Sequence, residues 1–238
     1  MEKVQIKPNL NLDNPVHISL IIPGWADNRR VLIGKYSLQR LANPNITISI
    51  RGVMKNDIEP MFSYYCRYMF SESTSVVDVD MSSINTEYIR YLGYAFEQSG
   101  VKEITFNNLK RLTGLYGCFY ECRNLERVQF RSRKGGIPKV SEIDHMFCDC
   151  PNLLSVDLRG LNLENVIYAN FMFYGCEKLR HVICAGFPIY GDKTNILKGC
   201  KSLTDYRVQR AIIEGGRPIK KSRNCTKPIN NEIVTVFR

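Results

Sequence analysis

The stretch that decides the fold is residues 146–184, MFCDCPNLLSVDLRGLNLENVIYANFMFYGCEKLRHVIC, because it contains one pattern twice. Each copy places a phenylalanine, Phe147 and then Phe173, three residues before a cysteine, six before a leucine and nine before a valine. A pattern that recurs at a fixed period is typical of repeat proteins, in which one unit cannot bury its apolar side alone and stacks on its neighbours.

The same pattern extends over most of the chain. Two further copies match closely, one from Phe119 and one from Leu197, and two looser copies begin at Phe70 and Phe96 with serine in place of the cysteine. We call the first residue of each copy its anchor. The six anchors are separated by 26, 23, 28, 26 and 24 residues, which lies in the range of leucine-rich repeats.

The spacing inside one copy predicts its local structure. Val156 and Leu158 alternate with a polar residue, which predicts a short strand with these two side chains on the buried face. Before each anchor, apolar residues recur every three positions, as at Val140, Ile143 and Met146. A period of three favours a 3₁₀-like or turn-rich return segment over a long α-helix, whose period is about 3.6 residues. We therefore expect a solenoid of short parallel β-strands with irregular return segments.

On these residues the chain resembles the BspA-like branch of the leucine-rich repeat family, whose units share a core of Met or Ala, Phe, two residues, Cys, two residues and Leu. Residues 61–208 carry the resemblance, and they depart from it between Phe96 and Phe106 and in the longer unit after Phe130. The resemblance implies a leucine-rich-repeat solenoid that binds rather than catalyses, and many members of the family are surface proteins. It covers neither the first 50 nor the last 30 residues.

Nine cysteines raise the question of disulfides, metals and nucleophiles. Four of them occupy the third position after an anchor and predict a ladder of small buried side chains: Cys122, Cys150, Cys176 and Cys200. An odd number of cysteines also suits a reducing compartment. The alternative is a metal site of His145, Cys148 and Cys150, but the spacing of the two cysteines differs from that of zinc sites. The sequence therefore predicts no metal, no cofactor and no catalytic site.

The two ends of the chain differ from the repeats. Val16–Ile22 and Ile46–Ile50 read as strands, and apolar residues between Asp57 and Phe70 recur at intervals of three and four, which predicts a short amphipathic helix. We interpret residues 1–60 as an atypical β-containing N-terminal cap or docking region and residues 61–208 as the solenoid. Residues 209–238 form a basic C-terminal extension that ends in a strand candidate.

Positive charge is concentrated at the ends. Residues 1–50 hold six basic and three acidic residues, residues 51–206 hold 19 and 18, and residues 207–238 hold eight and two. The candidate contacts with a protein partner or with phosphate are the basic residues of the 131–139 loop and of the C-terminal arm: Arg131, Arg133, Lys134, Lys139, Arg217, Lys220, Lys221, Arg223 and Lys227. The candidate assembly strand consists of Ile233, Val234, Val236 and Phe237.

These observations predict a non-catalytic protein-binding or structural scaffold. Its solenoid would recognise a protein partner, because the predicted strand faces carry mixed charge, and its basic termini would dock it into a larger assembly such as a virion or other particle. The alternative is a nucleic-acid-binding accessory protein that uses the 131–139 loop and the C-terminal arm.

The sequence also predicts where the protein works. Its first residues lack the apolar core of a signal peptide, and no apolar run is long enough to cross a bilayer. We therefore expect a protein of the cytoplasm or of an assembled particle, not classically secreted and not inserted into a membrane.

Overall fold

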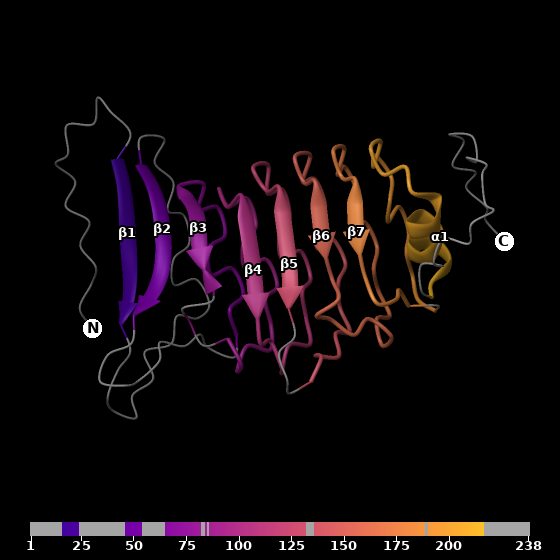
Figure 1. Ribbon diagram of the computed structural model, residues 1–238, viewed down its shortest axis with the longest axis horizontal. Helices are drawn as coiled ribbons and strands as arrows, with labels where there is room; N and C mark the ends of the chain where they lie inside the picture. The colour runs from indigo at the N-terminus through magenta and orange to yellow at the C-terminus, as the bar shows by residue number, and fades with distance from the viewer. Residues whose placement is uncertain are drawn as a thin grey trace, which may run out of the picture.

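The computed structural model describes residues 16–23, 46–53, 65–81, 84, 86–131, 136–188 and 190–216. In this part of the chain, parallel strands stack side by side along the long axis and a helix follows at the C-terminal end (Figure 1). The elements in order are β1 (Val16–Pro23), β2 (Ile46–Val53), β3 (Val76–Asp80), β4 (Glu103–Asn107), β5 (Arg127–Arg131), β6 (Ser155–Asp157), β7 (His181–Ile183) and α1 (Tyr206–Glu214).

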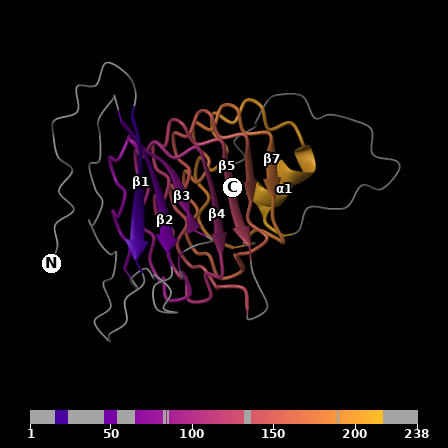
Figure 2. The ribbon, with the colours of Figure 1, turned by 60° about the vertical axis from the view of Figure 1, so that its left-hand side comes forward.

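The strands form two parallel sheets, β1-β2-β3 and β4-β5-β6-β7. Figure 2 shows the return segments running behind the strands from one repeat to the next. The register follows the sequence repeat, because Ile104 pairs with Val128 and Val128 pairs with Val156. The expected solenoid of short parallel strands is therefore confirmed, and the strands expected at 16–22 and 46–50 are present as β1 and β2.

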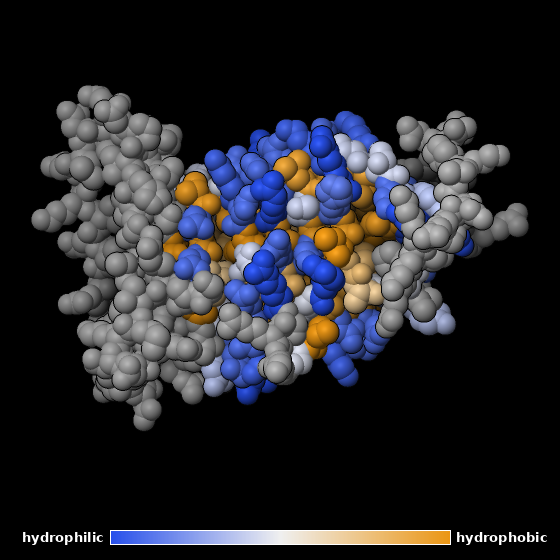
Figure 3. Space-filling view, in the orientation of Figure 1, coloured by the Kyte–Doolittle hydropathy of each residue, from blue (hydrophilic) through white to orange (hydrophobic). Residues whose placement is uncertain are grey.

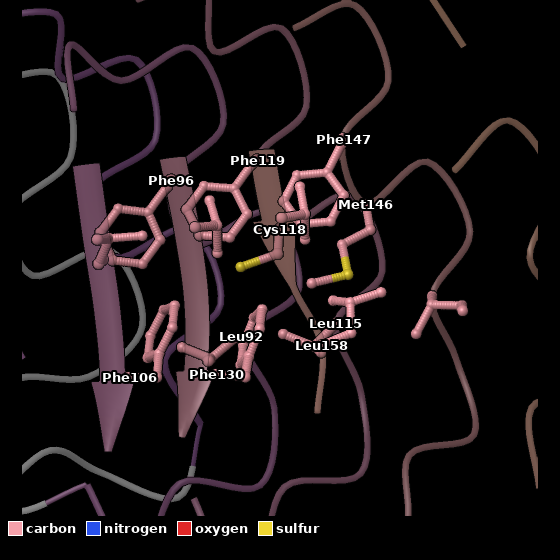
Figure 4. Close-up of a cluster of buried hydrophobic side chains, with 14 of the residues drawn as sticks. Leu92, Phe96, Phe106, Leu115, Cys118, Phe119, Phe130, Met146, Phe147 and Leu158 are labelled. Carbon is pink, nitrogen blue, oxygen red and sulfur yellow. The ribbon is translucent and has the colours of Figure 1, made fainter. Parts of the chain in front are cut away.

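The five phenylalanine anchors form one continuous aromatic ladder in the core, and Figure 4 shows three of them, Phe96, Phe119 and Phe147. The rings of Phe70, Phe96, Phe119, Phe147 and Phe173 are fully buried, and neighbouring rings stack with centroids 5.0, 5.2, 5.4 and 5.5 Å apart. On the strands, Phe106 and Phe130 stack in the same way at 5.0 Å. Equivalent positions of successive repeats thus contact one another in the core, as the stacking of similar units requires.

Consecutive turns, rather than a 3₁₀-helix, make up the return segments. Within one segment, the N–H of Cys118 donates to the carbonyl of Leu115 at 3.0 Å and the N–H of Cys122 to that of Phe119 at 3.3 Å, which explains the apolar period of three. The alternate N–H groups donate to the next repeat, as Phe119 does to Met146 at 2.9 Å. Each repeat is therefore held to its neighbour by return-segment hydrogen bonds as well as by the sheet.

Two residues of each return segment adopt a left-handed conformation, one two positions before the anchor and one two positions after it. In the repeat of Phe96 these are Tyr94 (φ 55°) and Gln98 (φ 51°). Every one of the six repeats places a side chain other than glycine at one or both positions, although this conformation costs an L-residue roughly 1 kcal/mol. The stacked hydrogen bonds hold the turns in this shape.

The cysteine ladder is confirmed. The thiols of Cys122, Cys150, Cys176 and Cys200 each donate to the carbonyl of the preceding repeat's anchor, at 2.7, 2.9, 3.0 and 3.0 Å. The first three of these cysteines are buried, and the eight cysteines of the described residues are free thiols.

The N-terminal helix prediction is wrong where the structure describes it. Tyr65 forms an isolated β-bridge with Tyr91, residues 67–72 form turns, and residues 57–64 lie outside the described part. The apolar spacing that resembled a helix belongs to the first repeat, because Cys66, Met69 and Phe70 occupy its inward positions and are fully buried.

The copy that begins at Leu197 lacks the strand that the pattern predicts at its end, since α1 spans Tyr206 and Val208. The side chain of Asp205 caps this helix by accepting the N–H of Arg207 at 3.1 Å, and Ala211 and Ile212 are buried. A helix satisfies its own backbone and so ends the stack without leaving a further open strand. The boundary proposed at residue 208 falls inside α1.

Candidate protein-binding surfaces

The outer face of the β4–β7 sheet carries two rows of side chains that cross the strands. Strand pairing aligns Glu103, Arg127, Ser155 and His181 in the first row and Thr105, Gln129, Asp157 and Ile183 in the second. Figure 3 shows this face as hydrophilic side chains with apolar patches between them. Within the first row, Arg127 forms an ion pair with Glu103, and both side chains are about half exposed.

A hollow of about 490 Å³ opens where the two sheets separate, between β3 and β4. Its lining combines carboxylates with one guanidinium and includes Asp78, Asp80, Glu103 and Arg131. Further along the sheet, the guanidinium of Arg159 donates to Asp157 at 2.6 Å and holds the pKa of this carboxyl below its ordinary value. The sheet side therefore offers paired charges of both signs.

Only two of the predicted contact residues lie in the described part of the chain. Arg131 ends β5, is exposed, and donates to the side chain of Gln129 at 2.7 Å. Lys139 is exposed, and its backbone pairs with that of Asn162. The other predicted contacts lie outside the described residues, as does the candidate assembly strand: Arg133, Lys134, Arg217, Lys220, Lys221, Arg223, Lys227, Ile233, Val234, Val236 and Phe237.

A second surface, which the sequence interpretation missed, lies on the return segments. Aromatic side chains of five successive repeats touch there, and all are half-buried: Tyr68, Tyr94, Tyr116, Tyr120, His145, Phe171 and Tyr174. We call this set the return-side stripe. Tyr68 stacks on Tyr94 at 5.2 Å, and His145 stacks on Phe171 at 5.0 Å. Comparing the residues just before and just after the anchors across repeats would have revealed it.

Carboxylates of the same return segments accompany the aromatic side chains of the stripe. Glu97 accepts a hydrogen bond from the hydroxyl of Ser71 at 2.9 Å, and Glu121 accepts one from the amide of Gln98 at 3.1 Å. Burial raises the pKa of Glu97, and the nearby charges of Glu72 and Glu121 act in the same direction. Burial, together with Glu121, raises the pKa of Tyr120 to about 12.

The described residues gather no group of three or more His, Cys, Asp or Glu side chains that could hold a metal ion. Burial raises the pKa values of the Cys150 and Cys176 thiols well above the ordinary value for cysteine, which disfavours the reactive thiolate. Within the same residues, the buried Nδ1 of His145 has no hydrogen-bond partner. No helix of the described chain is long and apolar enough to span a membrane.

The repeat is also found by comparison with known families. A family model described as BspA type leucine rich repeat region matches in six copies, over residues 55–180 and 94–215. No curated protein and no solved structure matches the chain.

Proposed function

The chain belongs to the BspA-type leucine-rich repeat family, and we propose that it is a non-catalytic scaffold that recognises a protein partner through the outer face of the β4–β7 sheet. The observation that carries the proposal is the pair of aligned rows on this face, the first of which is polar throughout. Strand pairing fixes their positions, so that Glu103, Arg127 and His181 form a preordered, exposed line.

Mixed charge supports a protein partner. Interfaces between proteins place groups of both signs opposite complementary groups, which sets partner choice and register. A surface that tracks nucleic acid along the sheet would need several basic groups in line with the phosphates. The first row instead pairs Arg127 with Glu103, and the second pairs Asp157 with Arg159.

The basic C-terminal arm supplies a second contact of the scaffold. The basic residues of the C-terminal arm, among them Lys220 and Lys221, dock the scaffold into a larger assembly, of which a virus particle is one form. The support is the charge distribution, because residues 207–238 hold eight basic and two acidic residues whereas residues 51–206 are nearly neutral.

A capture experiment tests recognition by the sheet. The full chain is immobilised and exposed to an extract of the cells that produce it, beside a variant in which Glu103, Arg127 and His181 are replaced by serine. The first row of this variant then carries serine at four positions, since Ser155 already lies in it. We expect the same proteins on the wild type and on a control, Glu177→Ser with Lys201→Ser, which removes an exposed ion pair outside both rows, and their loss from the serine variant.

Nuclease treatment distinguishes recognition of a protein from the nucleic-acid alternative, because it releases partners that are held only through bridging nucleic acid. Capture that is unchanged in the serine variant contradicts recognition by the sheet. Circular dichroism and thermal unfolding confirm that each variant is folded before the comparison.

A further inference from the structure

We infer that the return-side stripe is a second binding surface, and that its ligand is an extended, lysine- or arginine-bearing peptide segment of a partner protein. The juxtaposition that carries the inference is a continuous row of aromatic faces beside three carboxylates that form no ion pair with a lysine or arginine of the described residues. It goes beyond the sheet-face function and does not depend on it.

The aromatic part of the surface is continuous over five repeats. Tyr94 lies at its centre, with centroids 5.2 Å from Tyr68, 5.2 Å from Tyr116 and 6.4 Å from Tyr120. Gly117 leaves room for the ring of Tyr94 beside the next repeat, because a Cβ atom at position 117 would lie 2.5 Å from this ring. The ring of Tyr94 thus occupies the space that a side chain at position 117 would take, and it reaches both Tyr116 and Tyr120.

The negative part lies along the same repeats. Glu97, Glu121 and Asp149 accept hydrogen bonds from the side chains of Ser71, Gln98 and Cys148, none of which carries a charge. Among the described residues, no lysine or arginine forms an ion pair with these three carboxylates. The turns of the three central repeats, residues 93–98, 116–121 and 144–149, contain no lysine or arginine.

Aromatic faces and carboxylates together select for a cation. A lysine ammonium or arginine guanidinium is attracted by the face of a tyrosine ring, and more strongly where water is partly excluded. The fold already holds one cation in this way at the C-terminal end of the stripe, where the Nζ of Lys198 lies 5.8 Å from the ring centroid of Tyr174. The turns of the three central repeats offer the same ring chemistry with carboxylates and contain no lysine or arginine.

The dimensions fit an extended segment. Successive repeats are about 4.8 Å apart, so the carboxylates from Glu97 to Asp149 span roughly 10 Å. An extended peptide advances about 3.3 Å per residue and points alternate side chains to one side, so two or three alternating basic residues cover this distance. A short segment is therefore sufficient, and no folded partner domain is needed for contact.

The test measures binding of a defined peptide to the full chain. The probe is the acetylated and amidated peptide Lys-Gly-Lys-Gly-Lys, titrated by calorimetry at low salt, with Ser-Gly-Ser-Gly-Ser as the neutral control. We expect a dissociation constant on the order of 100 μM or lower for the lysine peptide. Binding should weaken as salt is raised, because the contact is largely electrostatic.

Two variants locate the site. Glu97→Gln with Glu121→Gln keeps the hydrogen-bond acceptors for Ser71 and Gln98 and removes two charges, and we expect at least a tenfold loss of affinity. Glu103→Gln removes a carboxylate on the sheet side and serves as the matched control, with binding unchanged. Equal affinity in both, or no binding to the wild type, overturns the inference.

A third variant examines the chain's own basic arm as a competitor. Replacing the arm's basic residues by serine, namely Arg217, Lys220, Lys221, Arg223 and Lys227, leaves the stripe intact. If the peptide binds only to this variant, the arm itself occupies the stripe and a foreign segment is the wrong occupant. The serine variant of the sheet row should bind the peptide normally, so failure of the proposed function and failure of this inference are distinguishable.

Discussion

Phe147 shows how one side chain supports the whole stack. Its ring is fully buried between Phe119 at 5.4 Å and Phe173 at 5.5 Å, so removing it leaves a cavity that touches three repeats. We predict that Phe147→Ala lowers the free energy of unfolding by roughly 3–5 kcal/mol in urea denaturation. Tyr190→Ala is the control, since this ring is 86% exposed, and it should change the stability little. Tolerance of Phe147→Ala would mean that the ladder does not carry the core.

The ionisation of Glu97 gives a pH-dependent prediction. Because burial raises its pKa in the folded state, the folded protein holds this proton more tightly than the unfolded chain does. Its contribution to stability is therefore full well below the ordinary glutamate pKa, at about pH 3, and is lost as the pH rises through the raised pKa. Glu97→Gln should be more stable than the wild type at pH 7, by less than about 1 kcal/mol since the group is partly exposed, and equal to it at about pH 3.

Glu177 provides a control of opposite sign. Its pKa is lowered by the hydrogen bond from Lys201, so its contribution is present at pH 7 and lost as the pH falls through the lowered pKa. Glu177→Gln should be less stable than the wild type at pH 7. Thermal unfolding at both pH values checks the pair, and the same sign for both variants would contradict the burial of Glu97.

At the scale of the turn, the left-handed conformation of Gln98 predicts which residues this position accepts. Its φ is 51°, its side chain is exposed, and its N–H donates to the carbonyl of Tyr120 at 2.8 Å. Asparagine tolerates this conformation whereas β-branched residues do not. We expect Gln98→Asn to stay within about 0.5 kcal/mol of the wild type and Gln98→Val to lose roughly 1–2 kcal/mol in chemical denaturation. Similar stabilities for the two variants would argue against a strained turn.

Helix α1 predicts a contrast between two neighbouring residues. Ile212 is fully buried against the last repeat, whereas Ile213 is 49% exposed. Ile212→Ala should cost roughly 2–4 kcal/mol and Ile213→Ala less than about 0.5 kcal/mol. Differential scanning calorimetry of the two variants measures the contrast. Equal, small losses would show that α1 does not cover the end of the stack.

The elements differ in how far the sequence predicts them. The strands and anchors could be predicted because Phe147 and Val156 recur at one spacing. Helix α1 could not, because Leu203, Tyr206 and Val208 keep the spacing of a strand while Asp205 supplies a helix cap that only the structure reveals. The return-side stripe was missed for another reason. The position two residues before the anchor holds Tyr68, Tyr94, His145 and Phe171, but the residue type varies and Gly117 interrupts the series, so no single residue marks the position.

The molecule as a whole is a stack whose two ends differ from its middle. If the basic arm mediates assembly, the full chain and a chain without the arm should differ in their oligomeric mass in solution. We expect the full chain to form oligomers in light scattering and a chain that ends at Gly216, just after α1, to be monomeric. This truncation keeps the helix, which a cut at residue 208 would divide. Monomers in both cases would leave the scaffold as a stand-alone recognition module and contradict the assembly role of the arm.

The hydrogen bonds between adjacent return segments also bear on how the chain folds. Phe119 bonds to Met146 and Phe147 to Met172, so the partners in the native structure are only one repeat apart in sequence. Closing a loop of one repeat costs the same conformational entropy wherever it occurs, and this cost grows only slowly with loop length. Folding can therefore begin at any well-packed pair of repeats and spread outward, and a chain with one more repeat would meet no higher barrier than this one.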